Sequence, residues 1–272
     1  MLIPVPQNIY YRDIIETVQG EIDLQDKEKI PGAEGGITVC FWGRLPFEEG
    51  WALQRVWRQG HRQGRVGGLL LLCEHPPTYT LGRGTEPAHL PGGTAALARR
   101  GAAVHRIERG GSVTFHGPGQ LVGYPIVDLR AWGRDVHAYL RRLEDVLIDV
   151  LAHWGLEAGR RPGLTGIWCA GSKLGAIGVH LRSWVTMHGF SLNVDPDLSF
   201  FGAVRPCGLE AGEVGAMARH LRAPPALGEV ADAAGRCFGR RFDRETRWVG
   251  ADELGRRIGE LRRAARPDGG ES

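Results

Sequence analysis

One amphipathic segment, followed by three strand-like segments, most constrains what this chain can fold into. Across Asp135–Trp154 apolar residues recur at three- and four-residue steps, which predicts a helix with one buried face that ends at Gly155. Three segments bounded by Gly, Pro, Asp or Ser then predict a meander of strands: Thr165–Cys169, Lys173–His180 and Trp184–Val194. A helix leading into adjacent strands favours a domain that mixes both elements in one core.

The chain before this helix alternates between strand and helix signals. The apolar spacing in Phe47–Gln59 predicts another helix. Strands are predicted at Ile37–Trp42, Leu69–Cys73, Thr78–Leu81, Ala103–Ile107 and Leu121–Leu129. Because Pro125 cannot donate a ladder hydrogen bond, we expect the last strand at a sheet edge or bulge. The predicted fold class is α/β (α+β), a mixed β-sheet with flanking helices, and not a doubly wound sheet.

The chain divides into three parts by composition. Residues 1–36 end in Pro31-Gly32-Ala33-Glu34-Gly35-Gly36 and are predicted to be an appended extension with a linker. Residues 37–245 contain the predicted strands and helices of the main domain. Residues 246–272 are predicted as a C-terminal helix followed by a polar tail.

Charge and cysteine content limit the class of protein. The net charge of +3, from 34 basic and 31 acidic residues, gives no whole-chain argument for binding nucleic acid. The five cysteines are odd in number and form no Cys-x-x-Cys pair, so neither a disulfide framework nor a structural metal site is expected. Reduced thiols indicate the cytoplasm, and we expect a monomer there.

The N-terminus and the hydropathy pattern predict neither a targeting segment nor a membrane-spanning segment. Met1-Leu2-Ile3-Pro4-Val5-Pro6 has no basic stretch before an apolar core, so no targeting segment is predicted. The longest apolar run, Leu69–Cys73, is too short to cross a membrane, and no membrane association is expected.

Cys207 is the first candidate for chemistry. It lies in the turn Arg205-Pro206-Cys207-Gly208, where a proline and a glycine fix the backbone and leave the sulfur uncrowded. Most cysteines are buried small apolar residues, but a core position rarely needs this frame. Cys169, close in sequence to Lys173, is a weaker rival.

Lys173 is the second candidate, because it lies in an apolar, glycine-rich strand of a domain in which lysine is scarce. An ammonium at the rim of an apolar trough has a depressed pKa. Such a lysine either stabilises a thiolate as a cation or accepts the thiol proton as a free base. A solvent-exposed strand lysine is the structural alternative.

A block dense in glycine and histidine, Arg109–Gln120, follows a predicted strand. His116 and His188 each precede a glycine, which suggests places where the backbone closely approaches a ligand. The chain has no phosphate-binding loop, no dinucleotide fingerprint and no serine-hydrolase elbow, so no cofactor is expected. No spacing of His, Cys and Asp resembles a metal site.

Taken together, the motifs resemble the lipoyl(octanoyl) transferase family, which is related to the biotin and lipoate protein ligases. The segments that carry the resemblance are Glu74–Gly82, Arg109–Gln120, Tyr124-Pro125, Gly166-Ile167-Trp168, Lys173 with Ala176-Ile177-Gly178, His188–Asn193 and Pro206-Cys207-Gly208. They occur in one order across roughly residues 37–245, which is specific although each motif alone is modest.

The resemblance implies an activity and a set of site residues. An octanoyl group moves from octanoyl-acyl carrier protein to Cys207, and then to a lysine of an apo lipoyl domain, with Lys173 activating the thiol. The implied acceptors are the lipoyl domains of 2-oxoacid dehydrogenase complexes and the glycine cleavage H protein. The implied acyl-binding residues are Arg109, Gly110, Gly111, Ser112, Val113, Thr114, Phe115, His116, Ala176, Ile177, Gly178, Gly189, Phe190 and Ser191, with support from His188 and Gln120.

One departure and several alternatives accompany this prediction. Where the family carries a hydroxyl pair after a valine, this chain has Val214-Gly215-Ala216-Met217. The enzyme alternatives are an amidotransferase between lipoyl domains and an ATP-dependent lipoate or biotin ligase of the same fold. A scaffold that binds these domains without turnover is the non-enzyme alternative.

Overall fold

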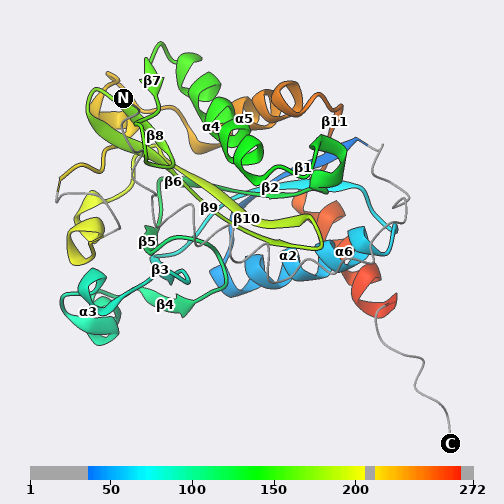
Figure 1. Ribbon diagram of the computed structural model, residues 1–272, viewed down its shortest axis with the longest axis horizontal. Helices are drawn as coiled ribbons and strands as arrows, with labels where there is room; N and C mark the ends of the chain where they lie inside the picture. Colours follow the sequence, from blue (N-terminus) through cyan, green and yellow to red (C-terminus); the bar gives the residue numbers. More distant parts are fainter. Residues whose placement is uncertain (1–35, 206–211, 265–272) are drawn as a thin grey trace, which may run out of the picture.

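Two β-sheets organise the protein in the computed structural model, which describes residues 36–205 and 212–264 (Figure 1). Within these residues the large sheet has, in spatial order, β11 (Thr246–Trp248), β1 (Ile37–Arg44), β2 (Gly68–Glu74), β6 (Gln120–Ile126), β10 (Val185–Asn193), β9 (Ser172–Arg182), β8 (Ile167–Cys169) and β7 (Ala158–Gly159). The small sheet has β4 (Ala103–Arg106), β3 (Thr78–Leu81) and β5 (Val113–His116). The predicted fold class is therefore confirmed.

The large sheet is mixed. β11, β1 and β2 are parallel, and β6, β10, β9, β8 and β7 each run antiparallel to the preceding strand. The α-helices are α2 (Phe47–Arg62), α3 (Gly93–Arg99), α4 (Val136–Ala152), α5 (Leu227–Phe242) and α6 (Ala251–Ala264). Short 3-10 helices lie at Pro87–His89, Leu129–Trp132, Leu198–Ala203 and Met217–Arg219.

The strongest sequence predictions are confirmed. The long helix begins where expected because the side chain of Asp135 accepts a hydrogen bond from the Ala138 N–H at 3.0 Å. The three meander strands are β8, β9 and β10. The sequence does not predict β11 or α3, which are among the shortest elements and have weak periodic signals.

Helices cover both faces of the large sheet (Figure 1). α4 and α5 pack on one face, and α2 and α6 pack on the other. Along β2, Leu70 and Leu72 point into the first core, whereas Leu69, Leu71 and Cys73 point into the second. Burial on both faces explains why this strand has a continuous apolar sequence.

The predicted edge position of Pro125 is wrong, because β6 is a central strand between β2 and β10. The β6–β10 ladder ends before this proline, and its ring lies against Gly189, where an added Cβ would be 2.4 Å from Pro125 Cδ. Thr186 Oγ1 donates to Pro125 O at 2.8 Å and accepts from Val127 N at 2.9 Å. A side-chain hydroxyl therefore provides pairing where the proline interrupts the backbone ladder.

The small sheet lies beside the α2 face of the large sheet, next to α3 (Figure 1). Its own core contains Tyr79, Phe115 and Val113, and the 3-10 helix Leu198–Ala203 packs against it. This arrangement leaves β9 and β10 facing β5, and the candidate site lies between them.

Candidate active site

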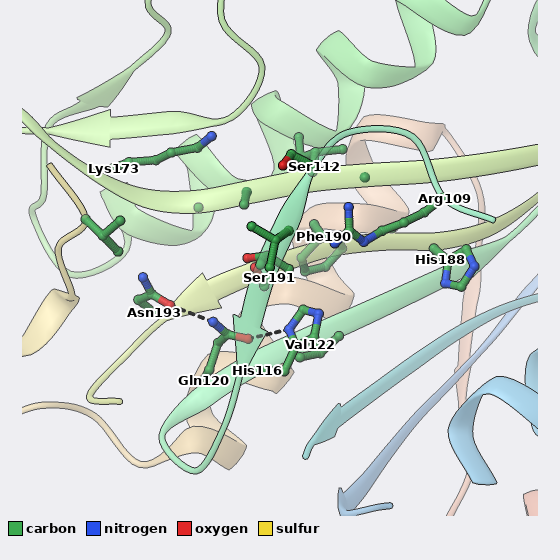
Figure 2. Close-up of a pocket in the computed structure, with 18 of the residues that line it drawn as sticks. Arg109, Ser112, His116, Gln120, Val122, Lys173, His188, Phe190, Ser191 and Asn193 are labelled. Atoms are coloured by element: carbon green, nitrogen blue, oxygen red, sulfur yellow. Dashed lines mark hydrogen bonds between the residues drawn. The ribbon is translucent and has the colours of Figure 1, made fainter. Parts of the chain in front are cut away.

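A pocket lies between the two sheets (Figure 2). β9, β10 and β6 line one side, and β5 with the loop before it lines the other. Phe47 of α2 and Phe201 also contribute to the lining of this cavity, whose volume is about 90 Å³.

The structure brings most of the sequence-predicted site residues to this pocket. Those that line it are Arg109, Ser112, Val113, Thr114, His116, Gln120, Ala176, Ile177, Gly178, His188, Gly189, Phe190 and Ser191. Lys173 lines the same pocket. Gly110, Gly111 and Phe115 do not line it, and Phe115 lies in the core of the small sheet. Cys207 falls outside the described residues.

Small side chains form the floor of the pocket. Ala176 pairs with Ser191 across β9 and β10, and Gly178 pairs with Gly189. These two pairs lie on the face of the sheet away from α4, whereas the side chains between them, such as Phe190, pack into the core on the α4 face. From Lys173 to Gly178 the floor follows β9 for roughly 16 Å at about 3.3 Å per residue. The result is a slot along the strand.

The loop with Arg109 forms the roof of the slot at its Gly178 end. Gly110 N donates to Val179 O at 2.9 Å, which docks the loop on β9. The buried guanidinium donates to Thr80 O at 2.6 Å and to Thr80 Oγ1 at 2.9 Å. The Arg109 stem crosses Gly178, where an added Cβ would be 3.0 Å from Arg109 Cδ. Gly178 thus gives this stem the space it needs.

Gly111 and Phe115 are neighbours in sequence of residues that line the pocket. Gly111 adopts a φ of +83°, which favours glycine, and its carbonyl lies where a Cβ on Gly82 would approach within 2.2 Å. Phe115 stacks on Phe200 with ring centroids 4.4 Å apart, inside the core of the small sheet. Both residues therefore support the wall that neighbouring residues present to the slot.

A chain of side-chain hydrogen bonds crosses the pocket (Figure 2). His116 Nδ1 lies 2.7 Å from Gln120 Oε1, and Gln120 Nε2 donates to Asn193 Oδ1 at 2.8 Å and to Phe115 O at 3.1 Å. Asn193 Nδ2 then donates to Gly215 O at 2.8 Å. Because backbone carbonyls only accept, the orientation of both amides is determined.

This orientation determines the tautomer of His116. Gln120 Oε1 can only accept, so His116 Nδ1 carries the proton and Nε2 faces Thr80 Oγ1 at 3.4 Å. Burial, together with the nearby His75 and Arg109, lowers the pKa of His116 to about 3. His116 is therefore neutral at physiological pH.

His188 closes the pocket near Arg109 in a constrained backbone conformation. Its φ is +56°, and its backbone N–H donates to Gln54 Oε1 at 2.8 Å. Burial lowers the pKa of His188 although Glu108 lies 3.6 Å from its Nε2. Burial also opposes ionisation of Glu108, but the adjacent His188 and the hydrogen bond from Trp51 outweigh it and lower the Glu108 pKa to about 2.

The backbone of Lys173 pairs with the segment that follows residue 211. Lys173 N donates to Glu213 O at 2.7 Å, and Lys173 O accepts from Gly215 N at 3.0 Å. These bonds form a parallel bridge between Lys173 and Val214. Gly215, where the sequence departs from the family pattern, has no space for a side chain, because its Cβ would be 2.6 Å from Ser172 Cβ.

The side chain of Lys173 lies between Gly166 and Trp168. A Cβ on Gly166 would be 2.6 Å from Lys173 Cε, and Lys173 Nζ lies 5.0 Å from the centroid of the Trp168 ring. From residue 30 onward Lys173 is the only lysine, and all other permanently charged basic side chains are arginines. Arginine stays protonated in proteins, so this position has an amine that can lose its proton.

The described cysteines are poor candidates for a thiolate. Burial raises the pKa of Cys40 to about 11, and it also raises the pKa values of Cys73, Cys169 and Cys237. Cys169, the rival suggested by the sequence, packs into the core beneath α4. None of these four lines the pocket.

Sequence reasoning did not select some residues that complete the site. Asn193 and Thr80 lie in segments that carry the family resemblance, and their polar side chains at strand positions were the available signal. Phe47 and Val214 line the pocket but had no local signal, because an apolar residue in a helix or loop is ordinary.

Within residues 36–205 and 212–264 neither a cluster of metal ligands nor a membrane-spanning helix is found. In these ranges no set of three or more His, Cys, Asp or Glu side chains is arranged to hold a metal ion. The helices in these ranges also lack the combination of length and apolar character needed to span a bilayer.

Known sequences place the chain in a family. Residues 46–239 match the model of the lipoyl protein ligase A/B catalytic domain. An octanoyltransferase of Solibacter usitatus is 48% identical over 203 residues, which cover 75% of this chain and 91% of that protein. An octanoyltransferase of Geobacter metallireducens is 48% identical over 188 residues, covering 69% of this chain and 85% of that protein.

Solved structures agree on the fold. A bi-partite lipoate protein ligase from Thermoplasma acidophilum superposes with a TM-score of 0.64 at 16% identity, covering 84% of this chain and 92% of that one. A lipoate-protein ligase A bound with ATP gives a TM-score of 0.63 at 15% identity, covering 84% and 94%. The chain therefore belongs to the lipoyl(octanoyl) transferase family within the lipoyl protein ligase A/B catalytic domains, and it is an acyltransferase.

Proposed function

We propose that this enzyme transfers an octanoyl group from octanoyl-acyl carrier protein to a lysine of apo lipoyl domains, through a thioester on Cys207. The acceptors would be the lipoyl domains of 2-oxoacid dehydrogenase complexes and the glycine cleavage H protein. The names of the relatives support the acyl group and the reaction class.

The observation that carries the proposal is the slot along β9 with Lys173 at one end. Its floor consists of the small pairs Ala176–Ser191 and Gly178–Gly189, which leave room for a linear chain. At about 0.8 kcal/mol per buried methylene, an octanoyl tail in this slot contributes several kcal/mol of binding. The acyl carbonyl then lies toward Lys173, where the amine acts on the reacting sulfur.

The first step exchanges one thioester for another. The Cys207 thiolate attacks the carbonyl carbon of the donor, the carbon–sulfur bond to the carrier breaks, and the carrier leaves as a thiol. The proton that Cys207 gives up passes through Lys173 Nζ to the leaving sulfur. No oxidant or nucleotide is consumed because the incoming acyl group is already activated.

The second step forms the amide. The neutral lysine amine of the lipoyl domain attacks the Cys207 thioester, the carbon–sulfur bond breaks, and Cys207 leaves as a thiolate. The amine loses one proton to Lys173, which returns it to the sulfur. The choice of Cys207 as nucleophile follows the family motif, and the burial of the other four cysteines supports it.

Intact-mass measurement after mixing the protein with octanoyl-acyl carrier protein tests the proposal. We expect one octanoyl adduct on the wild type and none on Cys207→Ser. Cys169→Ser is the matched control and should keep the adduct, because Cys169 lies in the core. A wild type that acquires no adduct, or an adduct that persists in Cys207→Ser, would refute the thioester pathway.

Two variants separate the two roles of Lys173. Lys173→Arg keeps a positive charge but cannot deprotonate, whereas Lys173→Ala removes both properties. If Lys173 only stabilises the thiolate, the arginine variant should acylate nearly as fast as the wild type. If it transfers the proton, both variants should be slow. Wild-type rates in both would remove Lys173 from the mechanism.

A donor comparison separates the related activities. Octanoyl-acyl carrier protein, an octanoylated lipoyl domain, and octanoate with ATP are each supplied with an apo lipoyl domain. The proposal expects the first donor to be used fastest. Preference for the second donor would indicate an amidotransferase, and dependence on the third would indicate a ligase.

A further inference from the structure

A wholly buried carboxylate lies on α4, the helix that packs against β8, and β8 pairs with β9 at Lys173. Glu144 is 0% exposed, although most acidic side chains lie in solvent. Its Oε2 accepts from Arg141 Nη1 at 2.6 Å and from Arg160 Nε at 2.7 Å. Its Oε1 accepts from the backbone N–H of Gly166 at 3.0 Å. The two arginines offset the negative charge of Glu144, and its Oε1 is left to accept the hydrogen bond from Gly166 N.

Gly166 connects this carboxylate to Lys173. It adopts a φ of +125°, a region that side chains rarely adopt. An added Cβ would be 2.6 Å from Lys173 Cε, 3.3 Å from Lys173 Nζ and 2.5 Å from Gly175 O. The end of the Lys173 side chain therefore lies directly on the Gly166 backbone, with the Trp168 ring as a second wall.

We infer that Glu144 is a positioning residue for Lys173, acting through the hydrogen bond to Gly166. The carboxylate holds the Gly166 peptide in its unusual conformation, and this peptide forms the surface on which the lysine methylenes lie. Removing the hydrogen bond lets the peptide rotate, and the amine then moves relative to the slot. A misplacement of about 1 Å at a reacting group can cost around a hundredfold in rate.

Two single substitutions separate the reach of Glu144 from the charge at its site. Glu144→Asp keeps the negative charge but is one methylene shorter, so its oxygen withdraws from Gly166 N. Arg141→Gln leaves the Glu144 carboxylate and its hydrogen bonds to Gly166 and Arg160 in place but changes the charge beside it by one unit. Positioning predicts that the aspartate variant disturbs Lys173 and the Arg141 variant does not. A purely electrostatic role predicts the reverse.

The signal of Lys173 itself provides the readout. The sequence has three lysines, Lys27, Lys29 and Lys173, so protein labelled with ¹³C at lysine Cε gives three side-chain signals. Lys173→Arg assigns the one that matters. We expect the Lys173 signal to shift in Glu144→Asp and to stay in Arg141→Gln. Asp149→Asn is the matched control: Asp149 lies on α4, as Glu144 does, and forms a more exposed ion pair with Arg241 of α5. Removing this ion pair should leave the Lys173 signal unchanged.

Gly166→Ala provides a second test that leaves the Glu144 carboxylate in place. The added methyl group collides with Lys173 Cε, so the same signal should shift. An unchanged Lys173 signal in folded Glu144→Asp or in Gly166→Ala overturns the inference, as does an equal shift in Glu144→Asp and Arg141→Gln.

The kinetic consequence rests on the proposed role of Lys173, and the spectroscopic one does not. We expect kcat of octanoyl transfer to fall about ten- to a hundredfold in Glu144→Asp, with little change in KM for the loaded carrier. If Lys173→Ala acylates normally, the proposed catalytic role of Lys173 fails while the labelled-lysine comparison still tests the positioning. If Lys173→Ala is slow and Glu144→Asp has normal kcat, the positioning inference fails alone.

Discussion

Gln120 Oε1 lies 2.7 Å from His116 Nδ1, and this contact orients the imidazole at the pocket wall. The other end of the amide donates to Asn193, whose own amide reaches Gly215 O beside Lys173. One buried glutamine therefore connects the acyl pocket to the segment that pairs with the lysine strand.

Gln120→Leu should destabilise the protein and leave His116 without its partner. The substitution strands the His116 N–H, Phe115 O and Asn193 Oδ1 in a buried region, each of which had a hydrogen bond to the amide. At about 1–3 kcal/mol for each unsatisfied group, we expect a loss of at least about 2 kcal/mol in the free energy of unfolding.

Urea denaturation measures this loss. Gln59→Leu is the matched control, because Gln59 is exposed near the end of α2 and its replacement should change stability by less than about 0.5 kcal/mol. Equal midpoints for the two variants would show that the buried network contributes nothing.

Stability should fall as the pH is lowered below 6.5. Burial lowers the pKa of His75 to about 4 and that of His116 to about 3, whereas both return to about 6.5 on unfolding. Between these values the unfolded chain binds more protons than the folded protein. The contribution is therefore complete above pH 6.5 and is lost as the pH falls through the interval.

Urea midpoints at about pH 6.5 and pH 5 check this expectation. For these two histidines the loss is on the order of 3 kcal/mol. This window lies above the ordinary range of carboxylate titration, so acidic residues contribute little to the difference. His116→Gln should show a weaker dependence. A stability that is flat from pH 7 to pH 5 would contradict burial of neutral imidazoles.

Ala176→Leu should shorten the acyl chain that the slot accepts. The larger side chain occupies the floor beside Ser191, and overpacking of this kind costs about 1–3 kcal/mol. We expect the rate of octanoyl adduct formation to fall roughly five- to a hundredfold, with a smaller effect for a butanoyl donor.

Competition between the two loaded carriers, read by intact mass, measures this preference. Ala152→Leu places the same added volume at an exposed position at the end of α4 and should leave it unchanged. Equal losses for both acyl lengths in Ala176→Leu would place the tail elsewhere.

Thr186→Val should destabilise the sheet at Pro125. The hydroxyl donates to Pro125 O and accepts from Val127 N, so an isosteric methyl group leaves both backbone groups without that partner. We expect a loss of about 1–3 kcal/mol. Thr165→Val is the matched control: within the described residues its buried hydroxyl has no hydrogen-bond partner, so its removal should cost little. Thermal melts compare the two.

The core elements were predictable because their signals are local. The periodicity of Asp135–Trp154 indicates a helix with one buried face, and the apolar run Leu69–Cys73 indicates a strand buried on both faces. Pro125 was misplaced for the opposite reason, since the hydroxyl that provides its local pairing comes from Thr186, far along the chain. β11 is a short strand that exists because it pairs with β1 at the other end of the sequence.

The features of the candidate site also divide into those that the sequence predicts and those that only the tertiary structure shows. Residue types in ordered motifs were sufficient to select Lys173, His116 and the small residues of β9 and β10, because glycines, a lone lysine and the family order are visible in one dimension. The tautomer of His116, the burial of Cys169 and the path from Glu144 through Gly166 to Lys173 were not visible there. Each depends on distances between segments that only the packed sheets and helices bring together.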